Sequence, residues 1–411
     1  SADSKVVYGA TSAYGSATSS ASLTTSHSIG VTGLSASTLY HYAVVSTDAS
    51  GNAATSSDQT LTTSSSGVAC PQGSSYPDGC SAAPSGTIEY PTLLNGYAVR
   101  APWNVAGVDY YVGLPSTTTL TDWENLSGPG ISVNTGTGVV RVDNTSGVIF
   151  NGVDFSLHGG ASLSFVNSPG GIVENSKFVK GSLTGSQGFA NSISADANSP
   201  GLTVMYSTID GGAPTYTNGS TLVSVLGGGA VTLKYNLLEN SDQHALELGG
   251  DNISLVDKYN YLYNIGNNGE ADNHPNLIQW GGATSTASTV TYNTSVQPFG
   301  NVAAGEGYQF YGNPPAYAIS EHATLTNNTM IATGTAGGQS ASYQVHGDVA
   351  TTTSTINSNY FDSTGAYGTF YPGSFSGWTG GTNYNMSTGA AIYAVPVISS
   401  IASTTASTTA T

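Results

Sequence analysis

Two neighbouring polar segments form the richest cluster of residues in this sequence that could carry out acid–base chemistry. They read SDQHALELGGD (residues 241–251) and GEADNHPNLIQW (residues 269–280), and together they hold two imidazoles and several carboxylates. A histidine beside a carboxylate can move protons during a reaction. If the protein is an enzyme, the candidate catalytic residues are Asp242, His244, Asp272 and His274. Such a cluster could also bind a divalent cation, but we expect neither a metal nor another cofactor.

A purely structural interpretation of the same two segments stays open. Asp242 and Asp272 would then cap turns through the adjacent backbone, while Ala245 and Leu246 would point into a core. The two histidines would form a solvated stack.

A recurring phrase predicts the elements that position these segments. Between residues 86 and 392, short apolar strands alternate with turns rich in Asn, Gly and Ser, and successive copies of the phrase lie 24 to 35 residues apart. This period, with a polar residue before an apolar strand, is typical of stacked β-helix coils. Aligned Asn side chains can bond to one another along such a stack. The copies are IFNGVDF (Asn151), VENSKF (Asn175), VMYSTI (Ser207), LKYNLL (Asn236), DKYNYL (Asn260), VTYNTS (Asn293), LTNNTM (Asn328) and NSNYFD (Asn359).

The repeat region resembles right-handed parallel β-helices of the pectin-lyase-like superfamily, in particular bacterial surface or secreted proteins. The phrases that carry the resemblance are WNVAGVDYYVG, GVIFNGVDFSLHGG, NLLEN, NYLYN and HPNLIQW. It implies the fold for some 300 residues, whereas function on this scaffold depends on grafted sites. Members of the superfamily often have His-x-Asp before the Ile-Gln pair, but this chain has Asn276, which cannot act as a base.

A second all-β module precedes the repeats. Residues 1–66 alternate apolar and polar in short runs, as in a small β-sandwich. The stretch LSASTLYHYAVVSTDASGNAATS resembles the later strands of fibronectin type III domains. The resemblance makes Leu34 a core leucine and Tyr40 the corner tyrosine, and it covers only part of the domain.

The last residues resemble the opening strand of the same module. In VPVISSIASTTASTTAT (residues 395–411), Pro396 and Ile398 occupy alternate positions and Ile401 follows.

We expect the chain to have four parts: a partial module (1–66), a linker (67–85), the β-helix (86–392) and this strand (393–411). Two explanations stay open. The chain is cut from a longer tandem array, or its final strand completes the module of the next subunit.

Composition excludes several partners. Only 8% of the residues are charged and the formal net charge is −17, which disfavours nucleic acids and anionic lipid surfaces. No apolar run is long enough to span a membrane. Cys70 and Cys80 lie in a short polar segment without further zinc ligands, so we expect a local disulfide and a secreted or cell-surface location.

These features favour an extracellular structural or adhesive protein whose copies join head to tail into filaments or arrays. Clusters of tyrosine and tryptophan could in addition bind neutral glycans. The alternative is a carbohydrate-active enzyme on the β-helix. It would be a hydrolase, which needs two carboxylates, or a lyase, for which only His244 and His274 could supply a cation.

Overall fold

The computed structural model is almost entirely β-structure and divides into two compact units. One unit comprises Ser1–Cys70 with Ser75–Ala82, and the other comprises the remaining residues. Within the described residues, no helix is long and apolar enough to cross a lipid bilayer. The structure describes residues 1–25, 27, 29, 31, 39–62, 86–182, 191–212, 221–250, 252–266, 276–280, 285–297, 306–310, 322–332, 343–347, 354–362, 369–370, 375 and 378–394.

The first unit is an antiparallel sheet with the strand order β2-β1-β3-β4, in which β5 also pairs with β3. Tyr40 lies in β3, half-buried, with its ring edge-on to Tyr8 at a centroid distance of 6.5 Å. Leu34, both cysteines and the terminal residues Pro396, Ile398 and Ile401 lie outside the described residues. The strands are β1 (Ala2–Gly9), β2 (Ser16–Thr24), β3 (Leu39–Thr47), β4 (Ala53–Thr55) and β5 (Gln59–Thr62).

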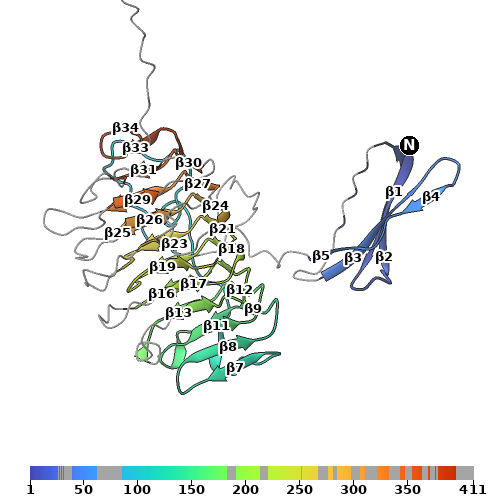
Figure 1. The fold of residues 1–411 in the computed structure, drawn as a ribbon, viewed down its shortest axis with the longest axis horizontal. Coiled ribbons are helices and arrows are strands. Elements are labelled where there is room, and N and C mark those ends of the chain that lie inside the picture. Colours follow the sequence, from blue (N-terminus) through green and yellow to red (C-terminus); the bar gives the residue numbers. More distant parts are fainter. Residues whose placement is uncertain are drawn as a thin grey trace, which may run out of the picture. The chain divides into compact units, whose positions relative to one another are not determined.

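The second unit stacks short strands into three long sheets, which we number 1 to 3 and together call the solenoid (residues 121–394; Figure 1). The chain visits sheets 3, 1 and 2 in rotation, and each strand pairs in parallel with the equivalent strand of the next coil. Antiparallel pairing occurs at the two ends, between β7 and β8 and between β33 and β34. This arrangement is consistent with a parallel β-helix.

The strand bounds are as follows. Sheet 1 contains β6 (Thr121–Asp122), β10 (Val153–Asp154), β13 (Lys177–Val179), β16 (Thr208–Asp210), β19 (Leu237–Glu239), β22 (Tyr261–Tyr263), β25 (Thr294–Gln297), β28 (Thr329–Ala332), β31 (Tyr360–Phe361), β33 (Asn383–Asn385) and β34 (Ala391–Ile392). Sheet 2 contains β7 (Ile131–Asn134), β8 (Val139–Asp143), β11 (Ser162–Val166), β14 (Ile193–Ala195), β17 (Val223–Val225), β20 (Leu246–Leu248), β23 (Ile278–Trp280), β26 (Glu306–Phe310) and β29 (Tyr343–Gly347). Sheet 3 contains β9 (Ile149–Asn151), β12 (Ile172–Glu174), β15 (Thr203–Met205), β18 (Gly229–Lys234), β21 (Ile253–Lys258), β24 (Ser285–Thr291), β27 (Ala323–Thr326), β30 (Ser354–Asn357) and β32 (Trp378–Gly380). Two 3₁₀ turns, η1 (Trp123–Asn125) and η2 (Leu157–Gly159), lie near the first coils.

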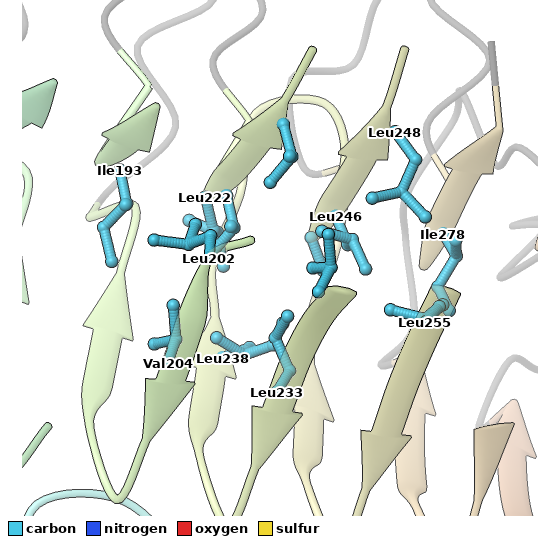
Figure 2. Packing of buried hydrophobic residues seen from close by; sticks show 14 of the residues in the cluster. Ile193, Leu202, Val204, Leu222, Leu233, Leu238, Leu246, Leu248, Leu255 and Ile278 are labelled. Carbon is cyan, nitrogen blue, oxygen red and sulfur yellow. The ribbon is translucent and has the colours of Figure 1, made fainter. Parts of the chain in front are cut away.

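The core consists of aliphatic side chains stacked in rows along the coil axis. Alternate residues of each strand point inward, so Val204, Leu233 and Leu255 of sheet 3 lie in the interior with Leu238 of sheet 1 and Leu246 of sheet 2 (Figure 2). Each is almost fully buried. Full burial of such a side chain stabilises a fold by roughly 1.5–3 kcal/mol. The inward position of Leu246, and that of Ala245, confirms the sequence-based prediction.

A buried ladder of polar side chains links the coils at the turn from sheet 3 to sheet 1. In each step the side-chain oxygen of one coil accepts a hydrogen bond from the backbone N–H of the equivalent residue in the preceding coil. Asn260 Oδ1, for example, accepts from the N–H of Asn236 at 2.8 Å. The ladder runs through Ser176, Ser207, Asn236, Asn260, Asn293, Asn328, Asn359 and Asn383. The predicted bonding between aligned Asn residues is thus confirmed.

The prediction of aligned polar residues, one from each copy of the phrase, was wrong at two positions, Asn151 and Asn175. Strand register places Ser176, and not Asn175, in line with Ser207, and it places Asn151 beside Glu174, two positions before the ladder. Asn175 instead fills the turn position that precedes the ladder, with a φ of 50°. Asn tolerates this left-handed conformation well, which explains why an Asn stands one position before the ladder residue. Asn175 and Asn151 bond to each other outside the ladder at 3.0 Å.

Residues 86–120 contain no strand and form a strap along the outer face of sheet 1. The Val99 N–H donates to the Met386 carbonyl at 3.0 Å, whereas the Gly113 N–H donates to the Tyr235 carbonyl at 2.8 Å. The strap therefore crosses many coils, running back toward the start of the solenoid. It packs closely, because a Cβ at Gly107 would lie 2.4 Å from the ring of Tyr261.

We predict that Asn260→Ala lowers the free energy of unfolding by about 1–3 kcal/mol, because the buried N–H of Asn236 loses its acceptor. Thermal or urea unfolding followed by circular dichroism measures the change. Asn198→Ala, at an exposed position, is the matched control and should leave stability nearly unchanged. Equal stability of the two variants would contradict a stabilising role for the ladder.

Candidate functional site

Two carboxylates from consecutive coils lie side by side on the outer face of sheet 1. Asp210 ends β16 and Glu239 ends β19, and strand register places them directly opposite each other. Neighbouring strands in a sheet are about 4.8 Å apart, so these two side chains, which we call the acidic pair, share one site. Asp210 Oδ1 accepts hydrogen bonds from Asn240 Nδ2 at 2.9 Å and from the Gly212 N–H at 2.8 Å. Asp210 is thus held in position by the loops that follow the strands.

The surroundings of Glu239 favour its protonated form. Burial, followed by the negative charges of Asp210 and Glu89, raises the pKa of Glu239 from 4.5 to about 7. Glu89 comes from the strap, so the strap contributes to the electrostatics of the site. A carboxylic acid that stays protonated near neutral pH can donate a proton, and a second carboxylate beside it can act as a base or nucleophile.

Aromatic rings border the acidic pair on one side. Tyr263 follows Glu239 in the same outward row of sheet 1. Tyr90 of the strap stacks on Tyr261 and Tyr263 at centroid distances of 5.2 and 5.3 Å. Tyr90 and Tyr263 are half-buried, whereas Tyr261 is fully buried. Carboxylates beside partly accessible rings are a combination that suits a sugar ligand.

Asp242, one of the predicted catalytic residues, forms a buried ion pair. Lys180 Nζ donates to Asp242 Oδ2 at 2.5 Å, and the two side chains are only 8% and 2% exposed. The contact joins the loop after β13 to the loop after β19, two coils further along the chain. An ion pair with so little access to solvent is a structural link between coils, and breaking it by removing one partner is costly.

His244 is buried as well. Its Nδ1 accepts a hydrogen bond from the Asn276 N–H at 3.0 Å, and desolvation lowers its pKa from 6.5 to about 3. The imidazole is therefore neutral at physiological pH and supports the backbone of the next coil. The prediction of a solvated histidine stack was wrong for this residue. Asp272 and His274 lie outside the described residues, so the predicted four-residue cluster cannot be assembled from the described ones.

The described residues contain no group of three or more His, Cys, Asp or Glu side chains that could hold a metal ion.

One further acidic residue, Asp257, lies inside the solenoid. Asp257 points inward in a row otherwise made of residues such as Leu233 and Val290. It accepts hydrogen bonds from Asn260 and Asn293 of the ladder at 2.7 and 3.0 Å, while burial raises its pKa to about 7. The position gives it a structural rather than a catalytic environment.

Sequence reasoning missed the acidic pair, although a usable signal was present. Asp210 follows Ser207 by three residues, and Glu239 follows Asn236 by three residues. Residues with the same offset from the repeat column in consecutive coils must be neighbours in the stack. Reading the repeat by columns, instead of by runs of polar residues, would have found the pair.

Comparison with known proteins adds no assignment to this geometry. No family model matches the chain, and no curated protein or solved structure matches it at a significant level.

We predict that Asp210→Asn lowers the pKa of Glu239, because Asp210 is the negative charge that opposes its ionisation most strongly. Carbon NMR of glutamate-labelled protein, titrated from pH 4 to pH 9, reports the pKa directly. Asp154→Asn, a change of another half-buried carboxylate of sheet 1, is the control and should leave the Glu239 titration unaltered. The same Glu239 pKa in Asp210→Asn and in the unmodified chain would contradict the interaction.

Proposed function

We propose that the protein is an extracellular structural or adhesive protein whose copies join head to tail. In this proposal the solenoid is a right-handed β-helix of the pectin-lyase-like superfamily and the first unit is part of a fibronectin type III-like module. The expected Cys70–Cys80 disulfide and the sparsely charged, Ser- and Thr-rich sequence support a secreted or cell-surface location.

The observation that carries the proposal is the apolar face of the N-terminal sheet. Antiparallel register places Val6 opposite Val44 and Tyr8 opposite Tyr42, so all four share one side with Leu61. Within the part of the unit that the structure describes, Val44 is 41% exposed and Leu61 is 40% exposed. Single sheets are stable when a second layer covers their apolar side.

Residues 395–411 of another copy are the proposed cover. The segment has no charged residue and is rich in β-branched side chains, so it suits both strand pairing and burial against Val44 and Leu61. Contact between unlike surfaces of two identical chains is heterologous. It extends into a filament unless rotation closes it into a ring.

We expect the chain to form polymers that are lost when residues 395–411 are deleted. Light scattering after size exclusion and electron microscopy distinguish polymers from monomers. Val44→Lys should also give monomers, because it places a charge on the apolar face of the sheet. Val45→Lys is the matched control, since the neighbouring residue points to the opposite side of β3.

Two results would refute this assembly. One is an unmodified chain that stays monomeric at high concentration. The other is a polymer that survives both the deletion and Val44→Lys while circular dichroism shows that the variants are folded.

The second candidate function, a hydrolase acting on a neutral polysaccharide, is favoured by the acidic pair. A proton donor with a pKa of about 7 beside a second carboxylate is the minimum that glycoside hydrolysis needs. The rings of Tyr90 and Tyr263 would then contact the sugar. A lyase is less well supported, because it needs a cation and His244 is buried and neutral.

A screen for release of reducing sugars from neutral and acidic polysaccharides tests the enzyme. If there is cleavage, Glu239→Gln and Asp210→Asn should each reduce it by roughly 100-fold or more. Asp154→Asn should leave it unchanged. No cleavage of any polymer, or cleavage unaffected by both changes at the acidic pair, would exclude this function for the site.

A further inference from the structure

The outer face of sheet 3 carries a row of threonines in register. Thr203 and Thr232 lie opposite each other on β15 and β18, and Val256 follows on β21. Four further coils each add one threonine to the same row. We call this set the threonine row, and its members are Thr203, Thr232, Thr289, Thr324, Thr355 and Thr379.

The row faces outward because its strand neighbours face inward. Leu233, Val290 and Leu325, which adjoin row members in sequence, are fully buried, whereas the row members are half-buried or, for Thr379, exposed. Their hydroxyls have no hydrogen bond to another described residue. Each position thus offers one hydroxyl and one methyl group to whatever contacts this face.

The spacing of the row is fixed by the backbone. Strands of a sheet are about 4.8 Å apart, and parallel stacking in register repeats this distance at each coil. A β-branched side chain has few rotamers, so each hydroxyl has only a few orientations relative to its strand. A rigid line of equivalent hydroxyls suits a ligand that is itself periodic and rigid.

We propose that the threonine row binds ice. Along one direction of an ice crystal, the oxygen atoms repeat at nearly the strand spacing. Several hydroxyls could therefore join one water lattice at once while the methyl groups fill gaps in it. The contact would be multivalent, and single weak bonds would add up along the row.

The threonine row has neither charged nor aromatic side chains, which favours ice over other solids as its ligand. The threonine row contains no charged residue in a chain of net charge −17, which matches an uncharged surface. The flanking positions of the later coils, Thr326 and Asn357, are also uncharged, whereas Lys234 and Lys258 flank the earlier coils. No aromatic ring lies in the row, although rings are the usual contact for crystalline sugar polymers. The uncharged half, around Thr324, is therefore the central part of the proposed site.

The inference is independent of head-to-tail assembly, because the row belongs to the solenoid alone. The chain is mixed with slowly growing ice, the fraction of protein incorporated is measured, and ice-crystal shape and thermal hysteresis are recorded below the melting point. We expect incorporation well above that of a protein that does not bind ice, together with faceted crystals.

The double variant Thr289→Lys, Thr324→Lys places two bulky charges in the row and should lose both effects. Ser164→Lys, Ser194→Lys, on the half-buried outward positions of sheet 2, is the matched control and should keep them. Circular dichroism and the unfolding temperature confirm that both variants are folded.

Three results would overturn the proposal. The first is an unmodified chain without ice affinity. The second is equal ice affinity in the two double variants. The third is an unmodified chain that binds crystalline cellulose or chitin but not ice, when the double variant Thr289→Lys, Thr324→Lys loses that binding. This result would assign the row to a sugar polymer.

Discussion

Parallel pairing of each coil with the next, in fixed register, is the constraint on which the rest of this structure depends. A strand of three residues cannot satisfy its own backbone, so its N–H and C=O groups find partners only in the adjacent coils. The buried ladder through Asn236, Asn260 and Asn293 fixes the same register at each turn. A residue's position within its coil therefore decides which side chains of other coils it meets.

Register explains why chemistry in this molecule appears as rows. Asp210 and Glu239 become a pair because they occupy the same place in consecutive coils, and their mutual repulsion follows from that placement. The threonine row arises in the same way on another sheet. Neither set is close in sequence. On this scaffold a functional surface can be changed one coil at a time, because each substitution alters one position in a row and leaves the stacking intact.

The sequence predicted the all-β repeat and the bonded Asn column well, because both depend on a periodic pattern that each coil repeats. It misplaced Asn151 and Asn175, since Asn suits both a ladder position and a left-handed turn. It could not predict the strap, because the strap residues do not follow the repeated phrase. Polar composition alone also suggested catalysis for Asp242 and His244. Their roles depend on burial, on Lys180 and on the Asn276 backbone, which no local pattern indicates.

The strap has a consequence for the order of events on the ribosome. Tyr97 and Val99 are translated first, yet the groups that receive them, Asp362 and the Met386 carbonyl, are translated 265 and 287 residues later. At usual elongation rates the delay is on the order of tens of seconds. Throughout that interval this end of the strap has no docking surface. This end of the strap can therefore dock on the outer face of sheet 1 only after the final coils have been synthesised.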